Sequence, residues 1–205
     1  SQAEAVLRKA ARVDIPVLLT GETGVGKEVA ARLLHAANRA DRPFAAVNCA
    51  AIPRDLVEST LFGHERGAFT GAVASSPGLL ARAGTGTLFL DEIAELPAEH
   101  QSKLLRVIQE RVFLPVGGRE ERRFEARLVC ATHADLAACV AAGTFREDLY
   151  FRINVVEVRI PPLRERPEDV SLLARRFLDD AVARFGLESR ALSPAGLAAL
   201  ADHDW

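Results

Sequence analysis

The stretch GETGVGKE, residues 21–28, constrains the fold of this chain more than any other feature. It lies between an apolar run, 15–20, and a segment, 27–39, whose apolar residues recur at helical spacing. Its order of glycine, four residues, glycine and lysine is the spacing of a phosphate-binding loop, in which backbone N–H groups surround phosphate oxygens at a helix N-terminus. The sequence therefore predicts an α/β fold with a parallel sheet.

Further apolar runs alternate with helical patterns along the chain. The expected strands are 15–20, 44–49, 87–90, 128–131 and 155–160, and the expected helices are 27–39, 99–110, 168–185 and one that starts at Ser193 and Pro194. This alternation predicts a five-stranded parallel sheet that is covered by helices on both faces.

A proline-rich stretch, 160–169, is the best candidate for a domain boundary. We expect an α/β nucleotide-binding subdomain over 1–163 and the start of a helical subdomain over 164–205. The charge-mixed stretch 119–127 is expected to form a hairpin or a solvated loop.

Composition excludes several classes of protein. With 49% hydrophobic residues the chain can build a sizeable core, and its net charge of -2 offers no electrostatic footprint for nucleic acid. No apolar run is long enough to span a membrane. Cys49, Cys130 and Cys139 lack CxxC spacing, so buried thiols in a reducing cytoplasm are expected. The absence of methionine predicts that the chain is part of a longer protein.

The phosphate loop is expected to bind a nucleotide, with Lys27 reaching the β- and γ-phosphates. A chance glycine-rich turn is the alternative. Glu28 stands where the general motif has Ser or Thr, so the usual hydroxyl ligand for Mg²⁺ is absent. The residues expected to contact the nucleotide are Gly21, Glu22, Thr23, Gly24, Val25, Gly26, Lys27 and Glu28.

The run GTLFLDE, 86–92, ends an apolar strand with two carboxylates. Ligands of open α/β folds bind at this edge of the sheet, and successive strand residues point in opposite directions. We expect Asp91 to hold Mg²⁺ and Glu92 to polarise the attacking water. A solvated strand end is the alternative for this run alone. Together with the phosphate loop it predicts hydrolysis of ATP or GTP.

The stretch HERGAFTGAVASS, 64–76, places a phenylalanine in a glycine-rich segment that favours a loop. With the motifs above, it makes the whole chain resemble the central AAA+ ATPase domain of bacterial enhancer-binding proteins, the activators of sigma-54 RNA polymerase. In that family GAFTGA tips a loop that is inserted in a helix and touches sigma-54. The alternative is that Phe69 folds back into the core. The implied partner-binding residues are Gly67, Ala68, Phe69, Thr70, Gly71 and Ala72.

The resemblance implies roles for other residues, and Glu28 matches this family's variant of the phosphate loop. Asn48 resembles the asparagine that restrains the catalytic glutamate, with a polar strand end as the alternative. Thr132 and His133 occupy the sensor I position, where the family most often has Asn after Thr; His133 is either a sensor near the γ-phosphate or a structural histidine. Arg146 and Arg152 match the arginine fingers, although Arg146 beside two acidic residues could be a surface salt-bridge residue.

Six residues apart, Arg146 and Arg152 would lie about 120° apart on a continuous helix. Both can serve one phosphate only if the helix ends near Arg152. Because a finger is supplied to the neighbouring subunit, the resemblance implies a closed ring, a hexamer in this family.

The resemblance thus implies an AAA+ P-loop NTPase in the bacterial cytoplasm that uses ATP and Mg²⁺ to remodel sigma-54 RNA polymerase. DNA binding is expected only through a carboxy-terminal helix-turn-helix domain that this chain lacks. The family's sensor II segment follows the point where the chain stops, so a truncated helical lid is expected. Two alternatives remain: another AAA+ remodelling ATPase, such as an unfoldase or loader, and a non-hydrolysing AAA+ scaffold.

Overall fold

The computed structural model describes residues 2–188 and 190–205, which form two compact units. The first is Ser1–Ile160 and the second is Pro161–Trp205.

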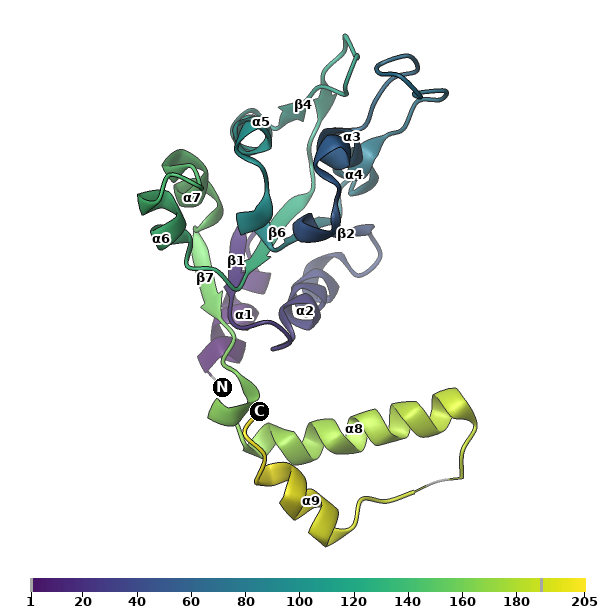
Figure 1. Ribbon diagram of the computed structural model, residues 1–205, viewed down its shortest axis with the longest axis vertical. Coiled ribbons are helices and arrows are strands. Elements are labelled where there is room, and N and C mark those ends of the chain that lie inside the picture. Colours follow the sequence, from purple (N-terminus) through teal and green to yellow (C-terminus); the bar gives the residue numbers. More distant parts are fainter. Residues whose placement is uncertain (1, 189) are drawn as a thin grey trace. The chain divides into compact units, whose positions relative to one another are not determined.

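Five parallel strands form the sheet of the first unit, in the order β2-β3-β6-β1-β7 (Figure 1). This confirms the predicted five-stranded parallel sheet. The strands are β1 (Val17–Thr20), β2 (Phe44–Asn48), β3 (Thr87–Asp91), β6 (Arg127–Thr132) and β7 (Val156–Arg159). β1 begins two residues later than expected, because Pro16 has no N–H to donate to a neighbouring strand.

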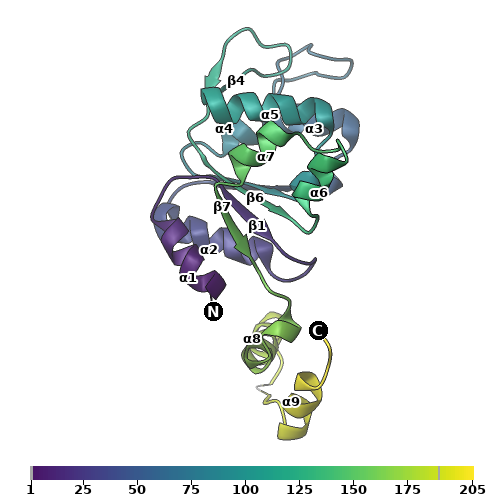
Figure 2. The same ribbon diagram turned by 90° about the vertical axis from the view of Figure 1, so that its left-hand side faces the viewer.

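Helices cover both faces of the sheet (Figure 2). One face carries α1 (Gln2–Ala11) and α2 (Lys27–Arg39). The other carries α3 (Val57–Phe62), α4 (Gly78–Arg82), α5 (Ala98–Glu110), α6 (Leu136–Ala141) and α7 (Glu147–Ile153). A short hairpin of β4 (Val112–Phe113) and β5 (Arg122–Arg123) lies outside the main sheet, and its second strand falls within the charge-mixed stretch expected to form a hairpin or loop.

The core of the first unit has two halves, one on each side of the sheet. Alternate residues of a strand supply them: Leu88 and Leu90 face the helices α3 to α7, whereas Phe89 between them faces α1 and α2. All three side chains are buried. Burial on both faces explains why these strands read as continuous apolar runs.

The three cysteines are free: Cys49 and Cys130 are buried, and Cys139 is partly exposed. Burial, and then the charges of Asp91 and Glu92, raise the pKa of Cys49 to about 12. Burial likewise raises the pKa of Cys130.

Because the thiolate is the nucleophile, we expect Cys139 to react first with Ellman's reagent at neutral pH. Cys49 and Cys130 should react at least about 10²-fold more slowly, since they must wait for the fold to open. Absorbance of the released thiolate measures both phases. A fast phase that persists in Cys139→Ser would contradict the assignment.

The second unit contains α8 (Glu168–Phe185) and α9 (Pro194–Ala201). Both helices were expected from the sequence. Gly186, with φ of 61°, ends α8 in the left-handed conformation that glycine adopts readily. The Ser193 side chain accepts a hydrogen bond from the N–H of Gly196, and Pro194 occupies the first turn of α9.

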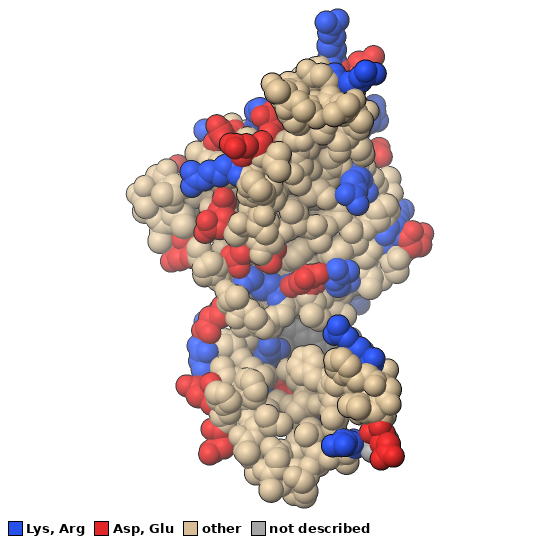
Figure 3. Space-filling model, turned by 45° about the vertical axis from the view of Figure 1, so that its right-hand side comes forward, with Lys and Arg blue, Asp and Glu red and all other residues tan. Residues whose placement is uncertain are grey.

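Charged side chains of both signs are dispersed over the face drawn in Figure 3. Lysine and arginine alternate there with aspartate and glutamate, and the described residues of that face form no broad basic patch. Among the described residues, no helix is both long enough and apolar enough to cross a membrane.

Candidate active site

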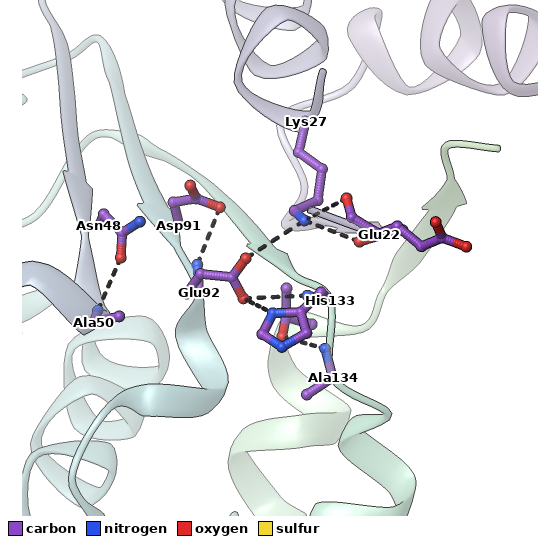
Figure 4. A network of polar contacts seen from close by, with 10 residues as sticks. Glu22, Lys27, Asn48, Ala50, Asp91, Glu92, His133 and Ala134 are labelled. Atoms are coloured by element: carbon purple, nitrogen blue, oxygen red, sulfur yellow. Dashed lines mark hydrogen bonds and ion pairs between the residues drawn. The ribbon is translucent and has the colours of Figure 1, made fainter. Parts of the chain in front are cut away.

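The strand order gathers the predicted site residues at one edge of the sheet. β6 lies between β1 and β3, so the segment that follows β6 lies between the phosphate loop after β1 and the two carboxylates that end β3. Thr20 pairs in register with Thr132, whose side chain is fully buried. Residues from four distant parts of the sequence therefore meet here (Figure 4).

The phosphate loop has the conformation that its glycines permit. Gly24 and Gly26 have φ angles of 85° and 97°, and Gly26 directly precedes α2. Lys27 is 6% exposed, and its Nζ donates to the carbonyl oxygens of Gly21 at 2.9 Å and Glu22 at 3.1 Å. The ammonium group is thus held within the loop, where it could also meet an anion.

We expect Gly21→Ala to lower the free energy of unfolding by about 2–4 kcal/mol. Gly21 has φ of +148°, and an added Cβ would lie 2.5 Å from the carbonyl oxygen of Ile160. Gly24→Ala is the matched control, because its Cβ would meet nothing within 4 Å and it carries only the backbone strain of φ +85°. Urea denaturation followed by circular dichroism measures both, and equal losses would contradict the steric explanation.

Glu92 is the centre of the polar network in Figure 4. Its carboxylate Oε1 lies 3.5 Å from Lys27 Nζ, and its Oε2 lies 2.6 Å from His133 Nδ1. The backbone N–H of His133 also donates to Oε2, at 3.2 Å. Glu92 is buried and has φ of 50°, a left-handed conformation that costs a non-glycine residue about 1–3 kcal/mol. This conformation follows the end of β3 at Asp91, and the Glu92 carboxylate lies beside Lys27 of the phosphate loop.

The two carboxylates differ in their electrostatics. Burial, and then the charge of Glu92, raise the pKa of Asp91. Burial alone would raise the pKa of Glu92 as well, but the hydrogen bonds from the His133 ring and backbone and the charge of Lys27 outweigh it and lower that pKa. Asp91 Oδ1 also accepts a hydrogen bond from the N–H of Glu92, at 3.1 Å. The pKa values of the two carboxyl groups are therefore shifted in opposite directions, and Glu92 is the one that ionises more readily.

Asn48 ends β2 directly opposite Asp91 in the register of the sheet. Its side-chain oxygen accepts a hydrogen bond from the N–H of Ala50, at 2.9 Å. The groups that hold Glu92 are Lys27 and His133. The proposed restraint of Glu92 by Asn48 stays a prediction.

The two candidate arginine fingers lie at opposite ends of α7. Arg146 precedes the helix, and its guanidinium donates to both carboxylate oxygens of Asp148, at 3.0 and 2.7 Å. Arg152 lies in the last turn, and the helix ends one residue later, as the sequence led us to expect. Both arginines are exposed. Among the described residues, no hydrogen bond or ion pair holds the Arg152 guanidinium.

The segment 63–77 joins α3 and α4 as a loop. Gly67 and Gly71 have φ angles of 80° and 99°, and the N–H of Gly67 donates to the carbonyl oxygen of Ala72 at 2.9 Å, which closes the tip. Phe69 is 41% exposed and Ala72 is buried. Phe69 therefore lies on the loop and outside the core.

Three features of this site were not predicted from the sequence. Two are the ion pair of Lys27 with Glu92 and the contact of His133 with Glu92, because both depend on strand order. The third is Val73, which is 82% exposed beside the loop tip. The apolar pair Ala72 and Val73 after the last glycine was the available signal.

The residues present suit a nucleoside triphosphate with Mg²⁺. The left-handed Gly24 and Gly26 lie directly before α2, whose N-terminus is a favourable place for phosphate oxygens, and the buried Lys27 supplies a positive charge. No cluster of three or more His, Cys, Asp or Glu side chains among the described residues could hold a metal by itself. One carboxylate plus phosphate oxygens is a usual environment for Mg²⁺, and Asp91 is placed to be that carboxylate.

Comparisons with known proteins point to one family. The model of the "Sigma-54 interaction domain" matches residues 1–159. The response regulator protein PilR of Pseudomonas aeruginosa is 53% identical over 186 residues, which are 90% of this chain and 42% of that protein. The DNA-binding transcriptional regulator NtrC of Azospirillum brasilense is 49% identical over 201 residues, 98% of this chain and 42% of that protein. The chain thus spans less than half the length of these relatives.

Solved structures agree with the sequence comparisons. NtrX from Brucella abortus, crystallised in complex with ATP, superposes with a TM-score of 0.88 at 36% identity, covering 100% of this chain and 46% of that one.

Proposed function

Because the chain belongs to the family of the sigma-54 interaction domain, an AAA+ domain of transcription activators, we propose that it is an ATP-hydrolysing activator module. In this proposal the chain binds ATP at the phosphate loop, and hydrolysis moves the loop 63–77 so that it remodels sigma-54 RNA polymerase into an open promoter complex. The observation that carries the proposal is the joint presence of the site around Glu92 and the exposed Phe69 at the tip of that loop.

We assign nucleotide binding to residues 21–28, with Lys27 on the β- and γ-phosphates. Asp91 would hold Mg²⁺, whose charge neutralises the phosphate oxygens. NtrX, which has the same fold, was crystallised with ATP, and this supports the proposal that the present chain binds the same nucleotide. In place of its contact with the loop carbonyls, Lys27 would then donate to phosphate oxygens.

Glu92 is assigned as the general base that takes the proton of the attacking water. Its ionised state at neutral pH suits this role, because a carboxylate must be unprotonated to accept a proton. Thr132 and His133 are assigned as sensor I, and Asn48 as a restraint on Glu92. The hydrogen bonds from His133 support a link between sensor I and the base.

The arginine fingers Arg146 and Arg152 are proposed to act on the site of a neighbouring subunit, which requires a closed homo-oligomeric ring, a hexamer in this proposal. Arg152 is the stronger candidate, since Arg146 is paired with Asp148. We further propose that 1–163 is the catalytic subdomain and 164–205 the start of the lid. DNA binding would belong to a helix-turn-helix domain outside this chain, and the cytoplasm is the compartment in which the proposed partner acts.

A trapping experiment tests the proposal. The protein is mixed with ADP, aluminium fluoride and Mg²⁺, purified sigma-54 is added, and complexes are separated by native electrophoresis. We expect the wild type to form a stable complex and Thr70→Ala to lose at least about 90% of it, because Thr70 is exposed at the loop tip. Thr60→Ala, in α3, serves as the matched control and should bind as the wild type does.

Two outcomes would favour the alternatives. A protein that hydrolyses ATP but forms no complex would be a different AAA+ remodelling ATPase. A protein that binds ATP without turnover would be a scaffold.

A further inference from the structure

We propose that His64 is a positioning residue for Phe69. Its imidazole links helix α3 to the phenyl ring at the tip of the loop and keeps that ring packed against the loop until a partner protein binds Phe69. The identity of the partner, sigma-54, rests on the proposed function. The restraint of Phe69 by His64 rests on the geometry of the loop alone.

The link begins on α3. Ser59 in that helix has its Oγ 2.7 Å from His64 Nδ1, which fixes the orientation of the imidazole. The His64 ring meets the Phe69 ring edge to face, with centroids 5.0 Å apart and an interplanar angle of 63°. Aromatic pairs favour this geometry. Two side-chain contacts therefore connect the helix to the residue at the tip.

The backbone of His64 is itself anchored on two sides. It exchanges both hydrogen bonds with Ser76 on the returning strand of the loop, at 2.9 and 2.8 Å. The next residue, Glu65, donates its N–H to the carbonyl oxygen of Val116 at 2.9 Å. The Glu65 carboxylate also accepts from Arg122, at 2.9 Å. Since the base of the loop is held in this way, the imidazole is a fixed platform.

The backbone at Phe69 is held only locally in comparison: its carbonyl oxygen accepts a hydrogen bond from the N–H of Ala72, at 3.0 Å, within the same turn. The backbone around it is the glycine-flanked turn 67–72, and a Cβ atom added at Gly67 or Gly71 would meet nothing within 4 Å. The ring is 41% exposed even while it rests on His64. An aromatic contact of this kind changes the equilibrium between the Phe69 ring packed on His64 and the ring released into solvent by about 2- to 10-fold. Removal of the imidazole should therefore raise the ratio of released to packed Phe69 ring by the same factor.

The first readout needs no partner. The protein is labelled with 4-fluorophenylalanine, and Phe69→Leu identifies the ¹⁹F resonance of residue 69. We expect His64→Ala to shift and narrow that resonance, and Ser59→Ala to move it in the same direction by less. His64→Phe keeps an aromatic platform without the bond to Ser59 and should resemble Ser59→Ala. An unchanged resonance in His64→Ala would overturn the proposal.

The second readout uses sigma-54 without nucleotide. We expect His64→Ala to bind it about 2- to 10-fold more tightly than the wild type, while the rate of ATP turnover and the circular dichroism spectrum report an intact fold. If a folded His64→Ala binds sigma-54 with unchanged or lower affinity, the proposal that His64 restrains Phe69 is wrong. If the wild type with ADP–aluminium fluoride fails to bind sigma-54, the proposed function fails, and the ¹⁹F measurement still decides whether His64 restrains Phe69.

Discussion

Replacing Arg152 with alanine is expected to slow ATP hydrolysis by about 10³- to 10⁵-fold, the largest effect of any single substitution in this chain. In our proposal the guanidinium would stabilise charge on the transferred phosphoryl group, and it would do so in the neighbouring subunit of the ring. Arg152 is exposed in the last turn of α7, so its own subunit leaves it available for that contact. Phosphate release at saturating ATP, at a protein concentration that supports the ring, measures the effect.

Mixing variants shows whether the finger acts between subunits. Arg152→Ala subunits keep Glu92, and Glu92→Gln subunits keep Arg152, so a one-to-one mixture should recover activity at about a quarter of its sites if rings assemble at random. Arg146→Ala is the comparison, and we expect a smaller loss because Arg146 is paired with Asp148. A mixture with no more activity than its parts would show that Arg152 acts within its own subunit or has no catalytic role.

Replacing Glu92 with glutamine is expected to lower kcat by about 10²- to 10⁴-fold and to leave ATP binding largely intact. An amide cannot take a proton from water, but its oxygen still accepts the hydrogen bond from the N–H of His133. Single-turnover hydrolysis measures the first effect, and fluorescence of a bound ATP analogue measures the second.

A stability control separates loss of chemistry from loss of fold in this variant. The thermal midpoint of Glu92→Gln should lie within a few degrees of the wild type, because the amide matches the carboxylate in shape. Glu95→Gln, in the short helical turn after β3, is the matched control for removing one acidic side chain and should hydrolyse ATP normally. Normal turnover by a folded Glu92→Gln would contradict the assignment of Glu92 as the base.

The fold was predicted from the sequence because its signals are local. Apolar runs bounded by turn residues identified the five strands of the main sheet, and the Ser193–Pro194 cap identified the start of α9. Shorter helices escaped prediction: α3 and α4 have six and five residues, too few to show a helical period.

The candidate site was predicted in part. The phosphate loop and the Asp91–Glu92 pair were found because each is a continuous motif at the end of a strand. Only the structure showed how far the phosphate loop lies from this carboxylate pair. It also showed the pairing of Arg146 with Asp148 and the contact between the rings of Phe69 and His64. The catalytic and partner-binding roles of these residues stay predictions until the variants are measured.

By itself, then, the sequence determined the kind of sheet, the phosphate loop and the position of the glycine-flanked loop, because periodicity and backbone preference act over a few residues. The tertiary structure decided which strands are neighbours. With β6 between β1 and β3, His133 reaches Glu92 at 2.6 Å and Lys27 reaches it at 3.5 Å. No local pattern encodes such distances, because strand order follows from how the helices cover both faces of the sheet and bury the whole core at once.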